Sequence, residues 1–385
     1  MKTYLVTGAA GFIGANFVKY MLKKHDDIKI IILDKLTYAG NIGTIEAELK
    51  DPRVSFVKGD ICNRELVENI FMKDEIDYAV NFAAESHVDR SIENPQIFLE
   101  TNILGTQNLM EVAKQFWSTG KDEKGYPIYK AGKKFHHVST DEVYGSLSKD
   151  YLEPIELVLD EKVAKIASGR TNLKTYGDKM FTESTPLDPR SPYSASKTAS
   201  DMIVMAYGET YKFPFNITRC SNNYGPYHFP EKLIPLIIKN ILEDKNLPVY
   251  GKGDNVRDWL YVDDHCKGID MVISNAPASE IYNIGGFNEE QNINIVKLTL
   301  DTVARIKNEE PKYHLITYVQ DRLGHDARYA IDPTKIVTEL GWYPETDFIT
   351  GIEKTIKWYL DNQEWVNEVS SGDYTKYYES MYKDR

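Results

Sequence analysis

Short apolar segments alternate with helical segments along the first 140 residues, and this alternation constrains the fold more than any other feature. Helical spacing of apolar side chains lies between most of these segments, as in Phe17, Val18, Met21 and Leu22. Strands that alternate with helices pair in parallel through right-handed crossovers. The sequence therefore predicts an α/β fold with a doubly wound parallel sheet of the Rossmann type. Its first five predicted strands are residues 4–7, 28–33, 54–57, 77–82 and 136–139.

Three glycines follow the first predicted strand and open a helix. Gly8, Gly11 and Gly14 permit a tight turn and a close approach of the backbone to a pyrophosphate, with the helix N-terminus facing the phosphates. Asp34 ends the second predicted strand, where a carboxylate accepts from ribose hydroxyls and repels a 2′-phosphate. These residues predict a dinucleotide site that prefers NAD to NADP, and the neighbouring Lys35 weakens that preference. A plain glycine turn and an N-cap aspartate are the alternatives.

A hydroxyl and two adjacent carboxylates, Thr140, Asp141 and Glu142, follow the fifth predicted strand. Tyr193 and Lys197 lie four residues apart on a predicted helix, so both side chains share one face, and an ammonium near a phenol lowers its pKa. Redox chemistry needs the hydroxyl and the Tyr/Lys pair, but it does not need an acid beside a base. The pair of carboxylates therefore predicts an elimination coupled to oxidation. A solvated acidic loop and a surface helix pair are the alternative interpretations.

The length of 385 residues exceeds that of most single cores and predicts two lobes. We expect an NAD-binding Rossmann domain at residues 1–220, which returns near 251–280. A smaller α/β lobe that binds the substrate is expected at 221–250 and 281–385. Residues 117–134 are polar and predict a surface excursion, while residues 146–185 predict a flap outside the sheet with a helical stretch near 160–166.

Composition excludes several classes of function. The formal net charge of −12 gives no overall attraction to nucleic acid or anionic lipid, and no apolar run reaches membrane length. The start of the chain lacks the apolar region of a signal peptide, which predicts a cytoplasmic protein. Cys62, Cys220 and Cys266 show no CxxC spacing and are expected to be free thiols in a reducing compartment. The histidines have no spacing typical of a metal site, so no metal is expected.

The glycine loop, the strand-end hydroxyl and the Tyr/Lys pair together resemble the extended short-chain dehydrogenase/reductase superfamily. Longer segments resemble the dTDP-glucose 4,6-dehydratase family more closely, and the resemblance runs to about Tyr329. Two segments, 117–134 and 146–185, are longer than the family pattern, and Leu323 stands where the family has proline. The segments that carry the closer resemblance are residues 34–41, 83–91, 139–145, 219–226, 230–235 and 257–262.

The resemblance implies conversion of dTDP-glucose to its 4-keto-6-deoxy product by a hydro-lyase that recycles NAD and acts as a homodimer through two long sheet-flanking helices. It implies catalytic roles for Thr140, Asp141, Glu142, Tyr193 and Lys197. The implied NAD-binding residues are Gly8, Gly11, Phe12, Ile13, Gly14, Asp34, Lys35, Leu36, Thr37, Asp60, Ile61, Ala83, Ala84, Ser86, Thr101, Tyr193, Lys197 and Asn223. The implied substrate-binding residues are Ser86, Thr140, Asp141, Glu142, Asn222, Lys232, Leu233, Pro248, Tyr250, Arg257, Asn292, Arg322 and His325.

Three alternatives remain open from the sequence. A nucleotide-sugar 4-epimerase would use the same Tyr, Lys and hydroxyl without an acid/base pair. Related dehydratases of CDP-glucose and GDP-mannose also compete, the first with Lys in place of Glu142 and the second with NADP. A non-catalytic NAD-binding regulatory protein would lack Tyr193 or Lys197. Thymidine and uridine differ by one methyl group, worth about 1 kcal/mol in an apolar pocket, so the base stays open.

Overall fold

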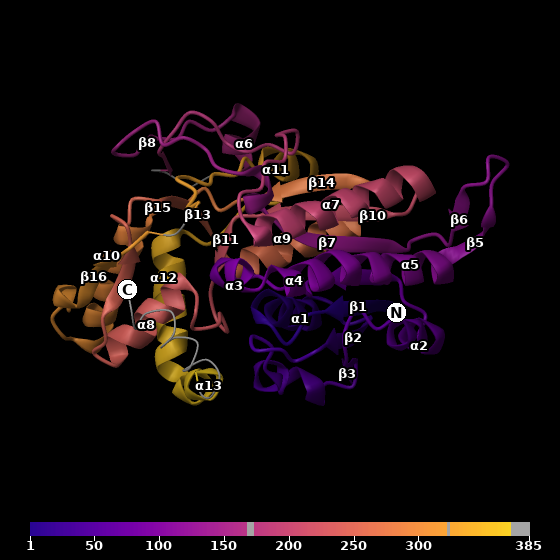
Figure 1. Ribbon diagram of the computed structural model, residues 1–385, viewed down its shortest axis with the longest axis horizontal. Coiled ribbons are helices and arrows are strands. Elements are labelled where there is room, and N and C mark those ends of the chain that lie inside the picture. The colour runs from indigo at the N-terminus through magenta and orange to yellow at the C-terminus, as the bar shows by residue number, and fades with distance from the viewer. Residues whose placement is uncertain (168–172, 322–323, 371–385) are drawn as a thin grey trace.

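A parallel seven-stranded sheet forms the centre of the larger part of the molecule (Figure 1). The structure is a computed structural model, and it describes residues 1–167, 173–321 and 324–370. Every neighbouring pair of strands in this sheet is parallel, which confirms the predicted fold class. In spatial order the strands are β14 (Glu280–Ile284), β10 (Phe215–Cys220), β7 (Lys134–Thr140), β4 (Tyr78–Asn81), β1 (Lys2–Thr7), β2 (Ile28–Asp34) and β3 (Val54–Lys58).

The central strands are apolar on both faces because helices cover the sheet on both sides. Along β2, Ile30 and Ile32 pack into one core, while Ile31 and Leu33 pack into the other, as the two-residue period of a strand requires. The first core is closed by α1 (Phe12–Lys24), α9 (Val262–Asn275) and α11 (Thr334–Leu340). The second core is closed by α2 (Arg64–Lys73), α5 (Thr106–Trp117) and α7 (Pro192–Tyr211).

The order in which the chain adds strands to the sheet reverses between β1 and β4. From β1 the chain moves outward to β2 and β3, and it then returns to β4 on the other side of β1. The loops at the carboxyl ends of these strands diverge there and leave a crevice, which is where ligands bind in open α/β sheets. The approach to α5 is irregular: α3 (Val88–Glu93) and α4 (Pro95–Phe98) lead into a π-helical segment, η3 (Leu99–Gly105), beside α7.

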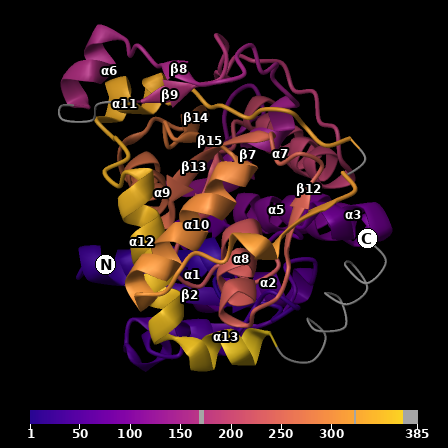
Figure 2. The ribbon, with the colours of Figure 1, turned by 90° about the vertical axis from the view of Figure 1, so that its left-hand side faces the viewer.

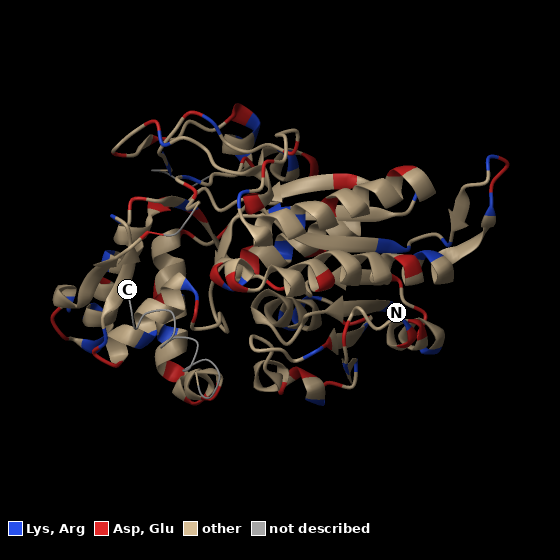
Figure 3. Ribbon diagram, viewed as in Figure 1, with Lys and Arg blue, Asp and Glu red and all other residues tan. Residues whose placement is uncertain are grey.

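A smaller part with its own apolar core faces the carboxyl ends of the sheet (Figures 1 and 2). Its strands form two small sheets, β11 (Asn222–Tyr224), β13 (Val256–Tyr261) and β15 (Glu289–Gln291), and β12 (Leu247–Tyr250) with β16 (Ile316–Val319). Its helices are α8 (Leu233–Leu242), α10 (Asn292–Lys307), α12 (Phe348–Asp361) and α13 (Gln363–Val369). Lysine and arginine are interspersed with aspartate and glutamate over both parts (Figure 3).

The domain boundaries stay a prediction, and the strand pairing bears on where they lie. Strand β14 closes one edge of the large sheet, so the return to this sheet extends four residues past the expected 280. Ile336, Val337 and Trp342 pack in the core of the large sheet as well. Segments of the two predicted domains are therefore interleaved along the chain.

The two segments expected outside the sheet lie at its periphery. Residues 118–129 form a hairpin of β5 (Ser118–Lys121) and β6 (Pro127–Tyr129) that projects from the far end of the molecule in Figure 1. The second segment carries β8 (Ile155–Glu156), the helix α6 (Glu161–Ile166) and β9 (Lys174–Thr175). Its described residues, 146–167 and 173–185, are called the insert below. The described residues also include the short 3₁₀ turns η1 (Ile42–Ile45), η2 (Glu48–Lys50), η4 (Asp141–Tyr144) and η5 (Tyr313–Leu315).

A buried ion pair joins α7 to the sheet directly beneath the crevice. Arg219 of β10 donates from Nε to Asp201 Oδ2 at 2.8 Å, and Arg219 Nη1 donates to the Tyr144 hydroxyl at 2.9 Å. Arg219 and Asp201 are 2% and 0% exposed. Because each charge is withdrawn from water, each depends on the other for compensation.

Replacement of Asp201 by asparagine should strongly destabilise the fold, because it leaves the Arg219 charge buried without its counter-ion. We expect the free energy of unfolding in urea to fall by about 3–5 kcal/mol. The control is Glu68→Gln, which breaks the more exposed pair of Arg64 and Glu68 and should change the free energy of unfolding by about 0.5 kcal/mol. Equal losses in the two variants would contradict this account of the buried pair.

Candidate active site

A cavity of about 460 Å³ lies where the carboxyl ends of the sheet strands face the smaller part. With two exceptions, every residue implied by the sequence for NAD or substrate lines this cavity. Arg322 is the first exception, because it lies outside the described residues. Leu36 is the second, because its side chain packs against the core of the large sheet instead. The predicted residues, far apart in sequence, thus come together in one site.

The turn from β1 into α1 has no room for a side chain at Gly8 or Gly14. Gly8 has a φ of +67°, and a Cβ there would lie 2.6 Å from the Ala83 amide nitrogen. A Cβ on Gly14 would lie 2.5 Å from the Gly8 carbonyl oxygen. Gly11 caps α1, whose first turn carries no acidic residue. The loop therefore presents a helix N-terminus and bare backbone to the cavity, an arrangement suited to a pyrophosphate.

Asp34 joins the end of β2 to the glycine loop. Its Oδ2 accepts from the Ala10 N–H at 2.9 Å and its Oδ1 accepts from the Leu36 N–H at 2.8 Å. Burial raises the pKa of Asp34, and the two backbone donors oppose this shift. Leu36 has a φ of +56°, and its side chain packs against the core of the large sheet. The residues fit the adenosine end of NAD.

Lys35 and Asp60 form an ion pair of 2.7 Å at the mouth of this end of the cavity. The hydrogen bond to Asp60 raises the pKa of Lys35. Asp60 also accepts from the Cys62 N–H at 2.8 Å. Lys35 is thus paired with a carboxylate, which reduces its attraction for a 2′-phosphate. Lys35 therefore no longer weakens the predicted preference for NAD over NADP.

Tyr193 and Lys197 lie in the first two turns of α7, which begins with a capping box at Ser191 and a proline at the first turn. The Lys197 ammonium donates to the Val138 carbonyl oxygen at 2.8 Å, and burial lowers the pKa of Lys197 to about 8. Burial, followed by the charge of Glu142, raises the pKa of Tyr193, while a hydrogen bond with Thr140 opposes this. Burial is thus the main influence on the pKa of Tyr193, and its lowering by Lys197 stays a prediction.

The two carboxylates after β7 occupy different environments. Asp141 is 2% exposed, and its Oδ1 accepts from Thr140 Oγ1 at 3.2 Å. Burial, then the charges of Glu142 and Asp258, raises the pKa of Asp141 well above its usual range. Glu142 is only half-buried. Asp141 therefore keeps its proton in conditions that ionise an ordinary carboxyl. Two neighbouring carboxyl groups in different environments can in this way serve as an acid and a base.

The smaller part supplies cationic and amide side chains to the other end of the cavity. Arg257 donates from Nη2 to the Asp326 carbonyl oxygen at 3.0 Å, and its guanidinium lies 4.1 Å from the centroid of the Tyr329 ring. Lys232 donates to the Ser86 carbonyl oxygen at 2.9 Å and so links the smaller part to the loop that follows β4 of the large sheet. The buried Oδ1 atoms of Asn222 and Asn292 have no hydrogen-bond partner among the described residues. This end suits a charged, hydrogen-bonding ligand such as a nucleotide.

Several residues that line the cavity were missed from the sequence. Glu85 and His87 lie inside the segment 83–91, whose resemblance was recognised, yet only its small residues were assigned. Trp259 has an apolar strand pattern that indicates core, and its buried Nε1 has no partner among the described residues. Asp326 and Tyr329 lie in the last stretch of the family resemblance, which runs to about Tyr329, yet neither residue was assigned to the site.

The comparisons with known proteins agree with this geometry. Residues 4–285 match the NAD dependent epimerase/dehydratase family. A dTDP-glucose 4,6-dehydratase of Shigella flexneri is 47% identical over 382 residues, which cover 99% of each chain. A dTDP-glucose 4,6-dehydratase of Bacillus anthracis, solved in complex with NAD, has 42% identity and a TM-score of 0.78 over 96% of this chain and 100% of that one.

A further solved structure is similar to this chain. The dTDP-glucose 4,6-dehydratase of Streptomyces venezuelae, solved with NAD and a second ligand bound, has 40% identity and a TM-score of 0.79. The match covers 95% of this chain and 99% of that one. The site and the comparisons lead to one conclusion: the chain belongs to the NAD dependent epimerase/dehydratase family, and its full-length relatives named here are dTDP-glucose 4,6-dehydratases.

Proposed function

We propose that this protein converts dTDP-glucose to dTDP-4-keto-6-deoxy-glucose and water, with NAD that ends each cycle unchanged. One observation carries the proposal. The acid/base pair Asp141 and Glu142 lines the same cavity as Tyr193, Lys197 and the glycine loop. The full-length relatives described above are dTDP-glucose 4,6-dehydratases, and one of these structures holds NAD.

NAD in the cavity would accept hydride from C4 of the sugar and later return it to C6. Tyr193 removes the proton of the C4 hydroxyl, and Thr140, which shares a hydrogen bond with Tyr193, holds the C4 oxygen. Lys197 is placed to hold the ribose next to the reacting ring and to favour the phenolate once substrate and cofactor fill the site. Asp34 and the glycine loop hold the adenosine and pyrophosphate at the far end.

The C4 ketone acidifies the hydrogen at C5 and makes an elimination possible. Glu142 removes the C5 proton, and Asp141 gives its proton to the C6 hydroxyl, which leaves as water. After hydride reaches C6, the proton on Glu142 returns to C5. The buried Asp141 retains its proton, and the half-buried Glu142 beside it faces the cavity, so the two environments fit the two roles.

The epimerase alternative leaves the two carboxylates without a task. It needs Tyr193, Lys197 and Thr140, but it never forms or breaks a bond at C5 or C6. An acid with a raised pKa beside a second carboxylate in the cavity therefore favours the dehydratase. Lysine at position 142 would favour a CDP-glucose enzyme, and glutamate stands there. The finer choice of thymidine over uridine rests on the relatives.

A homodimer is part of the proposal. Leu99 and Leu104 of η3 are 46% and 59% exposed, and Met202 of α7 is 53% exposed. These segments are adjacent, so the apolar side chains lie along the outer side of two sheet-flanking helices. Two copies that paired there would cover them.

A cytoplasmic location is also proposed. It is supported by the three cysteines, which all lie among the described residues and form no disulfide.

Within residues 1–167, 173–321 and 324–370, no helix has the length and apolar character needed to cross a membrane. In the same residues no cluster of His, Cys, Asp and Glu side chains is arranged to hold a metal ion.

The variant Glu142→Gln should separate oxidation from elimination. Tyr193, Lys197 and Thr140 remain, so C4 is still oxidised, but removal of the C5 proton stops. In a single turnover with dTDP-glucose we expect the absorbance of reduced nicotinamide to rise and persist, with product formation at least 100-fold slower. The control is Glu46→Gln, an exposed glutamate paired with Lys50, which should behave as wild type. Product at the normal rate, or no reduced cofactor, would rule out Glu142 as the base.

The dimer proposal predicts that Leu104→Glu together with Met202→Glu yields monomers. Charges at these positions cannot be buried against a second copy without a large desolvation cost. Sedimentation should show twice the mass of one chain for wild type and one chain mass for the double variant. Ile349→Glu, at a 65% exposed position on α12, is the control and should stay dimeric. A double variant that remains dimeric would show that the interface lies elsewhere.

A further inference from the structure

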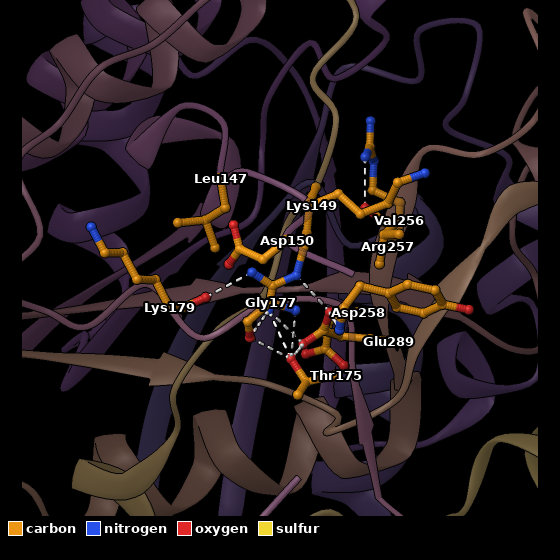
Figure 4. Close-up of polar contacts among 12 residues, drawn as sticks. Leu147, Lys149, Asp150, Thr175, Gly177, Lys179, Val256, Arg257, Asp258 and Glu289 are labelled. Carbon is orange, nitrogen blue, oxygen red and sulfur yellow. Dashed lines mark hydrogen bonds and ion pairs between the residues drawn. The ribbon is translucent and has the colours of Figure 1, made fainter. Parts of the chain in front are cut away.

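Arg328 follows the smaller part's strand β16 in sequence and is a buried cation, 0% exposed. It meets the carboxylate of Glu289 with two hydrogen bonds, from Nε to Oε2 at 2.7 Å and from Nη2 to Oε1 at 2.8 Å. In Figure 4, Thr175, Gly177 and Glu289 lie close together, and the carbonyl oxygen of Lys179 points toward them while its side chain extends away. A bidentate pair of this kind fixes the orientation of the guanidinium as well as its position.

The remaining donors of Arg328 go to the insert. Nη1 donates to the Lys179 carbonyl oxygen at 2.8 Å, and Nη2 donates to Thr175 Oγ1 at 3.0 Å and to the Gly177 carbonyl oxygen at 3.2 Å. Glu289 binds the insert too, because it accepts from the Tyr176 N–H at 3.1 Å. One buried ion pair thus holds a stretch of insert that has little regular secondary structure of its own.

The residues next to Arg328 in sequence form a wall of the nucleotide end of the cavity. Asp326 and Tyr329 line that cavity. Both contact Arg257, since the Asp326 carbonyl accepts from its guanidinium and the Tyr329 ring lies against it. The backbone of residues 327–329 also pairs with β13 at Val256. The position of Arg257 therefore depends on where residues 326–329 are held.

The insert contacts the acid/base turn at its other end. Phe181 stacks on Tyr144 with ring centroids 5.0 Å apart, and Tyr144 is two residues beyond Glu142. Phe181 also pairs its backbone with residues 330 and 332. The insert thus lies behind both the catalytic turn and the segment that follows Arg328, and it touches neither ligand end of the cavity directly.

We infer that Arg328 is a positioning residue for substrate, which ties the insert to residues 326–329 so that Arg257 is held toward the diphosphate. The inference rests on the proposed function, because it requires a nucleotide diphosphate at this end of the cavity. Arg328 acts through Asp326 and Tyr329 and does not itself touch the ligand. The cofactor end is held by other contacts, at Asp34 and the glycine loop, and does not depend on it.

A purely structural role makes a different kinetic prediction. If Arg328 only stabilised the fold, its loss would reduce the fraction of active enzyme, so kcat would fall and KM would stay the same. A positioning role raises the KM for dTDP-glucose and the Kd for dTDP, with kcat little changed. The amount of NAD bound to the purified protein reports on the cofactor end of the cavity. It therefore separates an effect on that end from an effect on the nucleotide end.

Two variants test the inference. Arg328→Lys keeps a cation beside Glu289 but cannot reach its two oxygens and the insert at once. The double variant Arg328→Met with Glu289→Met removes both charges, so no uncompensated charge stays buried and the chain can still fold. For both variants, calorimetry with dTDP on the NAD-loaded protein should give a Kd at least tenfold higher than wild type. KM should rise in parallel, kcat should change less than threefold, and NAD content should stay the same.

The control is Arg305→Lys, which alters a more exposed pair with Glu353 in the same part of the molecule and should leave the Kd for dTDP unchanged. Folded variants whose Kd for dTDP stays within twofold of wild type would overturn the inference alone. A fall in kcat with unchanged KM would overturn it in favour of a structural role. A wild-type protein that binds no dTDP would overturn the proposed function, and the inference with it.

Discussion

The parallel direction of the seven large-sheet strands is the constraint on which the rest of the structure depends. Because these strands run the same way, the residues that follow β1, β2, β4, β7 and β10 all reach one edge of the sheet. The glycine loop, Asp34, the acid/base turn and Asn222 come to one cavity for this reason, although Gly8 and Asn222 are more than two hundred residues apart. The smaller part closes that edge and adds the cations that a nucleotide needs.

Burial assigns different tasks to chemically similar groups at this edge. Asp141 is withdrawn from water next to another carboxylate, so it holds a proton, while Glu142 keeps contact with the cavity. The same burial raises the pKa of Tyr193 and lowers that of Lys197. Support for the site comes from buried ion pairs below and beside it, Arg219 with Asp201 and Arg328 with Glu289.

Most of the large sheet could be predicted from sequence because its strands are apolar on both faces and bounded by glycine or aspartate. Because such an apolar run ends where its strand ends, the sequence also places Asp34 and Thr140 at the ends of strands. The smaller part gave weaker signals, since β11 and β15 have three residues each and their neighbours in space are distant in sequence. Leu36 could not be placed, because its side chain packs against the core of the large sheet instead of the cavity. Arg328 could not be recognised either, because most of its partners in the insert are backbone carbonyls, which leave no trace in the residue pattern.

The central claim is that oxidation at C4 prepares an elimination between C5 and C6 in one closed site. The most direct measurement follows hydrogen through the reaction by mass spectrometry of the product. Proton exchange on Glu142 should place deuterium at C5 when dTDP-glucose reacts in D₂O, and a label at C4 of the substrate should appear at C6 of the same molecule, because the transferred hydride stays shielded from water. A label that remains at C4, with no deuterium at C5, would contradict the account and identify an epimerase.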